Sequence, residues 1–141
     1  MVAALTACAP AAVDSADIDQ WRVAHDTASS QDRTVLAALS ANVPARQGSS
    51  TDSQGEIEVD FDVPARVRRI EFSCFGGGSM SASGAAQAGS DAFSAVLGTF
   101  DCAQSPHEID VALFGDGPLD SFNFVAGDSS QDSAWYVTVF G

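Results

Sequence analysis

A strict alternation of apolar and acidic residues over residues 56–63 constrains the fold of this chain more than any other feature. The apolar positions are Ile57, Val59, Phe61 and Val63, and the acidic positions are Glu56, Glu58, Asp60 and Asp62. Successive side chains of a β-strand point to opposite faces, so a period of two predicts a half-buried strand with an acidic outer face. A β-rich domain is therefore expected to begin at Gly55.

Six further short strands are predicted downstream of this segment. They cover residues 70–74, 80–82, 93–102, 107–113, 122–125 and 135–140, with turns rich in Gly, Asp and Ser between them. About seven strands at such spacing predict a mainly β fold, an antiparallel β-sandwich of jelly-roll or immunoglobulin-like type over residues 55–141.

Helical signals precede the sandwich. Asp17 can cap a helix, and Gln20 stands where it completes a capping box. One helical face then carries Ile18, Trp21, His25 and Ala28. A second short helix is expected over residues 33–39, so residues 17–43 form a helical segment of one or two helices. The polar, Gly- and Ser-containing residues 44–54 are interpreted as a linker.

The charge balance excludes several classes of function. The chain has 141 residues, the size of one domain, and 6 Arg with no Lys stand against 19 acidic residues, for a net charge of −13. Affinity for DNA or RNA comes from Lys and Arg at phosphates, so a nucleic-acid partner is not expected. The lack of Lys also excludes P-loop and Schiff-base chemistry, because each requires an ammonium group.

The first residues fit a lipidation signal. Residues 5–8 (LTAC) match the bacterial lipobox, in which small residues precede a cysteine that receives acyl chains. Residues 1–7 are then the remnant of a signal peptide, and residues 8–16 contain the lipidated Cys8 and a flexible tether. Membrane lipid would be the partner of Cys8, and the protein would lie outside the cytoplasm on the outer face of the cell membrane. The alternative is a chance Ala-rich leader on a cytoplasmic protein.

The two remaining cysteines leave three interpretations open. Cys74 and Cys102 form an even pair, which in an extracytoplasmic setting predicts a disulfide. Inert free thiols are the second interpretation, and a reactive cysteine paired with His107 is the third. A metal site lacks the ligand spacing, because no C-x-x-C is present and His25 and His107 are isolated.

Calcium is the one cofactor for which the sequence offers candidates. Carboxylates on loops rich in Gly and Ser can supply the oxygen ligands that this cation prefers. The candidate residues are Asp116, Asp120, Asp128 and Asp132. Their spacing matches no established calcium loop, and no other cofactor is indicated.

Aromatic residues of the last strand are candidates for carbohydrate binding. Trp135 alternates with Tyr136 and is expected to face the core. Tyr136 and Phe140 then belong to the opposite set, which could face outward. Exposed aromatic rings stack on sugars, so these two residues are candidate ligand-binding residues.

Several segments together resemble small surface lipoproteins of GC-rich Gram-positive bacteria. They are the lipobox, the strand end Phe72–Gly78 (FSCFGGG), a second cysteine further on, and the closing segment 134–139 (AWYVTV). The resemblance implies a membrane-anchored surface location and a disulfide-stapled β-sandwich, and it implies no reaction.

These observations predict a membrane-anchored, non-catalytic binding or envelope-structural module, with a cell-wall glycan or a protein as partner. The alternative is a secreted carbohydrate- or calcium-binding domain, or a hydrolase whose site is assembled from dispersed residues. A concave pocket with convergent Asp, His and Ser would favour the enzyme, whereas a flat face with exposed aromatics would favour binding.

The lipobox generates a direct test. With a full upstream signal supplied, Cys8→Ala is expected to move the protein from the membrane to the culture medium, or to leave it unprocessed, because no acyl chain can be attached. Membrane and medium fractions of parent and variant are compared by immunoblot. Equal membrane partitioning of the two would contradict the lipoprotein interpretation.

Overall fold

The alternating residues form strand β2 (Ile57–Ala65), as their period predicts. The carboxylates at positions 56, 58, 60 and 62 are exposed, while Ile57, Val59 and Phe61 pack against the core. The structure is a computed structural model that describes residues 13–46 and 56–141. Cys8 and most of the expected linker 44–54 lie outside the described residues.

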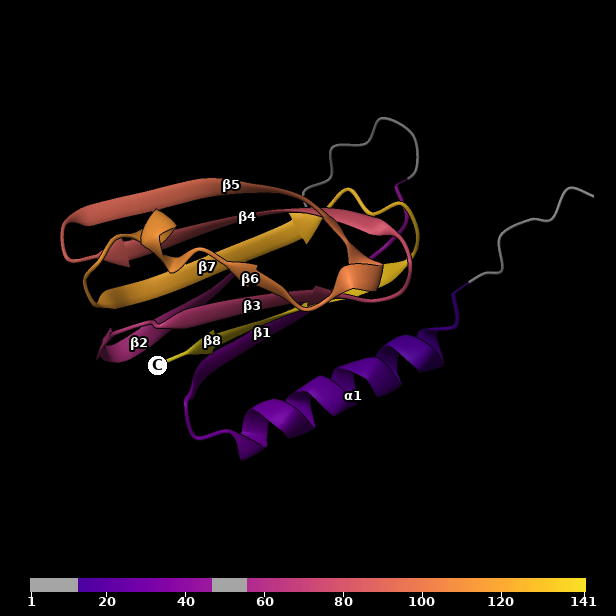
Figure 1. Cartoon of the computed structure of the whole chain (residues 1–141), viewed down its shortest axis with the longest axis horizontal. Helices are drawn as coiled ribbons and strands as arrows, with labels where there is room; N and C mark the ends of the chain where they lie inside the picture. Colours follow the sequence, from indigo (N-terminus) through magenta and orange to yellow (C-terminus); the bar gives the residue numbers. More distant parts are fainter. Residues whose placement is uncertain (1–12, 47–55) are drawn as a thin grey trace, which may run out of the picture.

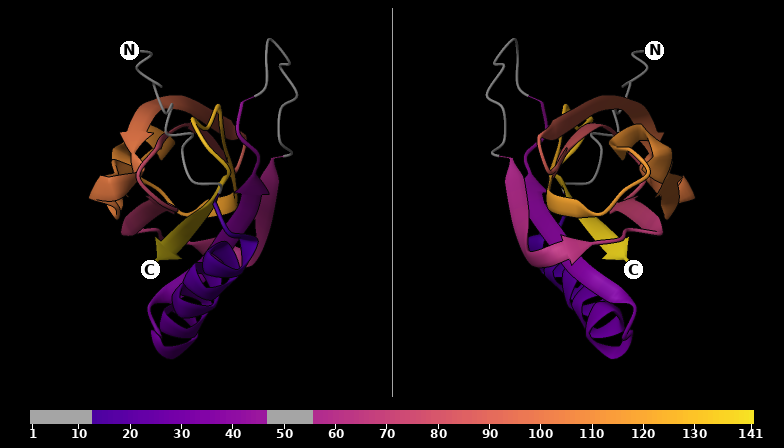
Figure 2. Two further views of the ribbon diagram at one scale, coloured as in Figure 1. Left: turned by 90° about the vertical axis from the view of Figure 1, so that its right-hand side faces the viewer. Right: turned by 90° about the vertical axis from the view of Figure 1, so that its left-hand side faces the viewer.

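The described strands form two antiparallel sheets of four strands each, which face one another as a sandwich (Figures 1 and 2). Sheet A has the order β1-β8-β3-β6, and sheet B has the order β2-β7-β4-β5. The other elements are α1 (Ser15–Gln31), β1 (Val35–Val43), β3 (Arg69–Cys74), β4 (Ser79–Ala88), β5 (Asp91–Asp101), η1 (Cys102–Gln104), β6 (His107–Ile109), η2 (Val111–Phe114), β7 (Leu119–Gly127) and β8 (Ser133–Phe140). The mainly β sandwich is thus confirmed, with eight strands rather than seven.

The second helix predicted over residues 33–39 is wrong, because these residues lead into and form most of β1. This strand pairs with β8 from Val35 opposite Phe140 to Val43 opposite Ser133. Its Ala residues favour a helix locally, but pairing with a neighbouring strand outweighs so small a preference. Strand β1 is the eighth strand, and it brings residues upstream of Gly55 into the sandwich. The predicted strand 107–113 is also shorter, since β6 ends at Ile109 and η2 follows.

Aromatic side chains fill the space between the sheets. Phe72 and Trp135 come from sheet A, Phe122 and Phe124 come from sheet B, and all four are completely buried. The Phe124 ring lies 5.4 Å from Phe72 and 5.1 Å from Trp135. Burial of each such side chain stabilises the folded state by about 1.5–3 kcal/mol. This cluster therefore fixes how the two sheets face each other.

The predicted disulfide between Cys74 and Cys102 is present. Their Cα atoms are 4.9 Å apart, and both residues are buried. Cys74 ends β3 in sheet A, whereas Cys102 directly follows β5 in sheet B. The bridge therefore joins the two sheets at one end of the sandwich, and the free-thiol and reactive-cysteine interpretations are wrong for this pair.

Helix α1 packs on the outer surface of sheet A, against β1 and β8 (Figure 2). Asp14 caps its first turn, accepting a hydrogen bond from the Ala16 amide at 2.9 Å. Trp21 and His25 face the sheet, and the His25 ring stacks on Tyr136 of β8 at 4.8 Å. Among the described residues, no helix is long and apolar enough to cross a membrane.

Removing the disulfide is expected to destabilise the sandwich strongly. The bridge spans a sequence separation of 28, and a loop of that length corresponds to about 3.5 kcal/mol in the chain-entropy estimate. The variant Cys74→Ala/Cys102→Ala should therefore melt at least about 10 °C below the parent. Calorimetry with and without reductant measures this change. Titratable thiols at both positions in the denatured, unreduced parent would contradict the bridge.

Docking of α1 is expected to weaken in mild acid. Burial lowers the pKa of His25 below its ordinary value, against the charges of Asp26 and Glu71, which raise it. A lowered pKa in the folded state means that the unfolded chain binds the proton more readily. Neutral His25 therefore makes its full contribution to the free energy of unfolding above the ordinary His pKa of about 6.5. This contribution is lost as the pH falls through the lower pKa of the folded state.

Chemical denaturation between pH 5 and 7.5 tests this expectation. His25→Phe should flatten the pH dependence of the unfolding free energy, since the ring remains but no longer titrates. Tyr136→Phe is the matched control. It removes a hydroxyl that donates to Asp26 and should cost about 1 kcal/mol while the slope with pH is retained. An unchanged slope in His25→Phe would refute the role of His25.

Candidate functional site

The two aromatic residues predicted to face outward are buried, so this prediction is wrong. Helix α1 covers Tyr136, whose hydroxyl donates to Asp26 Oδ1 at 2.9 Å and lies 3.2 Å from Ser29 Oγ. Phe140 is 8% exposed, and the Arg69 guanidinium lies 4.0 Å from the centre of its ring. Neither ring is accessible for stacking on a sugar.

The four calcium candidates lie at the two ends of β7 rather than at one site. Strand β7 separates the pair at 116 and 120 from the pair at 128 and 132 by about 27 Å, at 3.4 Å per residue. Three of the carboxylates have structural contacts. Asp120 accepts from the Gly89 amide at 2.6 Å, Asp132 accepts from the Ala45 amide at 2.7 Å, and Asp128 pairs with Arg46 at 3.0 Å. The described residues contain no group of three or more side chains able to hold a metal ion.

The two histidines lie in separate packing environments and share no contact partner among the described residues. His25 lies between α1 and sheet A, against Trp21 and Tyr136. His107 lies on β6, where its Nε2 shares a 2.7 Å hydrogen bond with the Asp101 carbonyl and its ring packs 4.9 Å from Phe100. Both contribute to packing between elements.

The outer surface of sheet B, named the open face, is not covered by α1. Its side chains come from alternate positions of β2, β7, β4 and β5, and they remain partly or fully exposed. By contrast, α1 packs over β1 and β8 on the corresponding surface of sheet A. The open face is therefore where a partner can reach the sheet directly.

Strand register places polar side chains in rows across the open face. Glu58 pairs with Asn123, Asn123 pairs with Ala85, and Ala85 pairs with Ser94. The next row consists of Asp60, Ser121, Gln87 and Ala92. Neighbouring strands lie about 4.8 Å apart, so each row crosses about 14 Å of surface from a carboxylate on β2 to β5.

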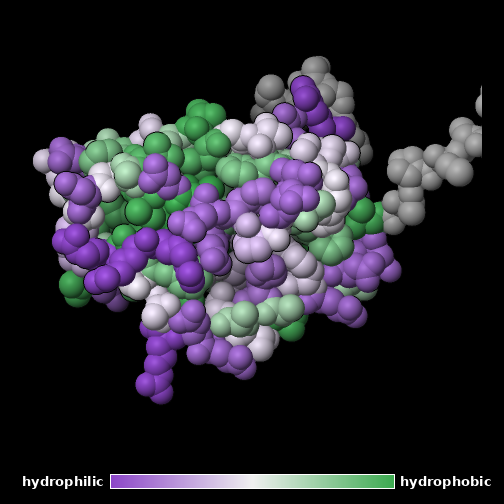
Figure 3. Space-filling view, in the orientation of Figure 1, coloured by the Kyte–Doolittle hydropathy of each residue, from purple (hydrophilic) through white to green (hydrophobic). Residues whose placement is uncertain are grey.

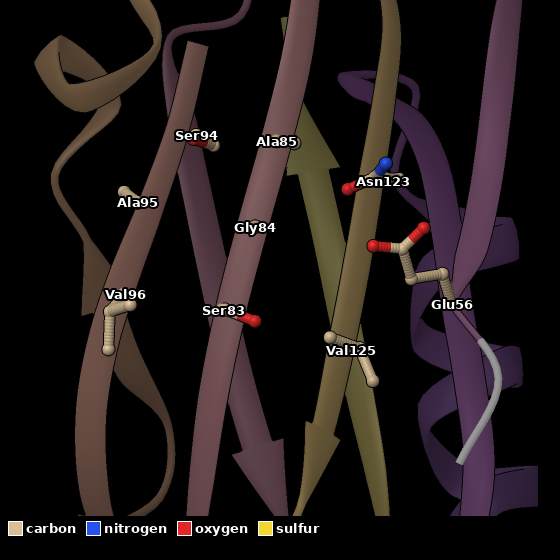
Figure 4. Close-up of a pocket in the computed structure, with 9 residues that line it drawn as sticks. All are labelled: Glu56, Ser83, Gly84, Ala85, Ser94, Ala95, Val96, Asn123 and Val125. Atoms are coloured by element: carbon tan, nitrogen blue, oxygen red, sulfur yellow. The ribbon is translucent and has the colours of Figure 1, made fainter. Parts of the chain in front are cut away.

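Small side chains in the middle of these rows leave the face hollowed (Figure 4). One hollow of about 310 Å³ is lined by Glu56, Ser83, Gly84, Ala85, Ser94, Ala95, Val96, Asn123 and Val125. A second, of about 220 Å³, shares Ala85, Ser94 and Asn123 with the first. The two hollows therefore form one shallow trough along the strands.

The chemistry of the trough is acidic along one side and neutral elsewhere. Glu56, directly before β2, lies on one side of the trough, and Asn123 of β7 lies next to it (Figure 4). Ser83 of β4 lies in the middle, and Ser94 of β5 lies on the far side. Within the described part of the chain, the side chains of Asn123, Ser83 and Ser94 make no hydrogen bond to another residue. Val96, which is 89% exposed, lies on the opposite side. The trough thus offers free donors and acceptors and a one-sided negative charge.

Sequence reasoning found only the acidic side of this site. The row of carboxylates along β2 follows from the alternating pattern, which predicts an acidic outer face but no polar neighbours for it. Asn123, Ser83 and Ser94 lie on three other strands and carry no motif. Only the register between β7, β4 and β5 brings them together.

Comparison of the chain with protein-family models, curated proteins and solved structures finds no match.

Proposed function

We propose that this chain is a non-catalytic binding module of the bacterial cell surface, and that the open face of sheet B is its binding surface. Cys8 would anchor the module to the outer face of the cell membrane. The lipobox at residues 5–8 supports this location, as does the disulfide, because such bonds persist outside the cytoplasm.

The fold is assigned to the jelly-roll type rather than the immunoglobulin type. Strands pair as β1 with β8, β2 with β7, β3 with β6 and β4 with β5, as in one long hairpin rolled into two sheets. Eight strands with this pairing are characteristic of a jelly roll. The roll gives sheet B a continuous outer surface, formed by both arms of the hairpin.

The difference between the two outer surfaces is the observation that carries the proposal. Helix α1 packs over β1 and β8 of sheet A, whereas sheet B presents a trough with free amide and hydroxyl groups. Ligand sites combine a concave shape with a few polar groups that fix orientation. The trough is shallow and wide, which suits an extended chain better than a compact small molecule.

The negative charge of the open face favours a basic, extended polypeptide segment as the partner. Carboxylates at 56, 58, 60 and 62 occupy every second position from the residue before β2 onward. They are about 6.7 Å apart, which equals the spacing of alternate side chains in an extended peptide. A net charge of −13 would draw such a segment toward the protein. Exposed ion pairs contribute only about 0–1 kcal/mol each, so affinity would depend on several acting together.

The proposal is tested with an eight-residue peptide of alternating Lys and Thr. Titration into the ¹⁵N-labelled protein should shift amide signals of β2, β7, β4 and β5 and leave those of α1 unchanged. Glu58→Gln/Asp60→Asn should weaken binding about five- to tenfold, because two ion pairs are removed.

The matched control is Asp19→Asn/Glu108→Gln, which removes the same charge at exposed positions away from the open face. Equal weakening by this control would show unspecific attraction and contradict the site. The same titration with a neutral glycan oligomer tests the other partner class. If the glycan binds and the peptide does not, the partner assignment is wrong, and if neither binds at millimolar concentration, the binding surface is wrong.

A further inference from the structure

A third hollow, of about 400 Å³, lies at the end of the sandwich where the β4–β5 turn approaches the segment between η2 and β7. Figure 1 shows this end of the molecule at the left, away from the start of α1. Phe93, Pro64 and Pro118 supply apolar lining, and Asp91, Asp116 and Asp120 supply carboxylates. In Figure 3, apolar residues of this side gather toward the same end, bordered by hydrophilic ones.

Backbone conformation holds the apolar wall in place. Gly115 has a φ of +86°, which side chains other than glycine rarely adopt. A Cβ atom at this position would lie 2.8 Å from the Phe93 ring. Glycine at 115 thus lets the loop pass directly over the aromatic ring, and the ring becomes part of the lining.

The carboxylates of this hollow have little compensation from the chain itself. Neither ion pair among the described residues involves them. Asp120 accepts one hydrogen bond, from the Gly89 amide. Arg66 approaches the hollow, but it donates to the backbone carbonyl of Asp116 at 3.3 Å rather than to a carboxylate. The chain also contains no Lys that could serve as a partner.

These features of the hollow favour an organic cation over a metal ion as its ligand. Calcium needs six to eight oxygen ligands at about 2.3–2.6 Å, and the described residues do not bring three candidate ligands together for it. A metal ion would also leave the apolar lining without a role. A primary ammonium on an alkyl stem uses both features, because the stem contacts Phe93 and the prolines while the ammonium donates to carboxylates.

We therefore propose that the hollow lined by Phe93, Asp91 and Asp116 binds a primary alkylammonium group, such as a lysine side chain or a linear diamine. This site lies at the end of the strands and shares only Phe93 with the hollows of the open face, and its carboxylates are not among those that line them. The hollow could bind a free amine or an amine that belongs to a larger molecule. In both cases the bound group is an ammonium on an alkyl stem.

The probe is 1,5-diaminopentane, titrated into the full ¹⁵N-labelled chain. Saturable shifts are expected at the amides of residues 88–91 and 115–120. Asp91→Asn/Asp116→Asn should weaken binding about five- to tenfold, because two ion pairs at exposed carboxylates are lost. Phe93→Leu should also weaken binding while the charge is unchanged. A parallel titration with N-acetyl-lysine amide tests whether the hollow binds a lysine side chain as well as a free diamine.

The control variant Asp19→Asn/Glu108→Gln should bind within twofold of the parent. Pentan-1-ol, which keeps the stem without the charge, should cause no saturable shift. Thermal melting of each variant verifies that the sandwich is intact. Absence of saturable shifts with the diamine, equal weakening by the control variant, or stronger binding of Ca²⁺ than of the diamine would each overturn the proposal. Loss of peptide binding at the open face alone would not contradict the alkylammonium site.

Discussion

Burial of β8 on both of its faces organises the rest of the molecule. Trp135, Val137 and Val139 point into the core between the sheets, while Tyr136 on the other face contacts α1. The strand also lies between β1 and β3, so its backbone groups are paired on both sides. A strand that is apolar on both faces requires a layer on each side. Helix α1 supplies the second layer, and the covered surface of sheet A follows from that need.

Sheet B has no such requirement, and this difference gives the protein an open surface. Strand β7, the neighbour of β2 and β4, has Phe122 and Phe124 on its inner face and Ser121 and Asn123 on its outer face. An antiparallel sheet with this pattern is stable with one side in water. The open face can therefore remain uncovered without loss of stability, and a partner would bind it by matching charge and shape rather than by burying apolar surface.

Prediction from the sequence succeeded where one residue pattern decided the structure. The alternation around Val59 identified β2, and the even cysteine pair identified the disulfide. Prediction failed where a distant element decided the outcome. Strand β1 is Ala-rich and becomes a strand through its pairing with β8, and Tyr136 is buried because a helix 110 residues earlier in the chain covers it. The trough around Asn123 depends on register between strands, which no local pattern records.

The position of α1 also bears on how the proposed anchor would present both sites. Six residues separate Cys8 from the start of the helix at Ser15, and a fully extended segment of that size reaches about 25 Å when both attachment points are included. Lipid on Cys8 would therefore keep the beginning of α1 close to the membrane surface. The β4–β5 turn and the hollow beside it lie at the opposite end of the sandwich (Figure 1). An anchor at Cys8 would then direct that hollow away from the bilayer, and because α1 covers sheet A, the open face would stay accessible from the side.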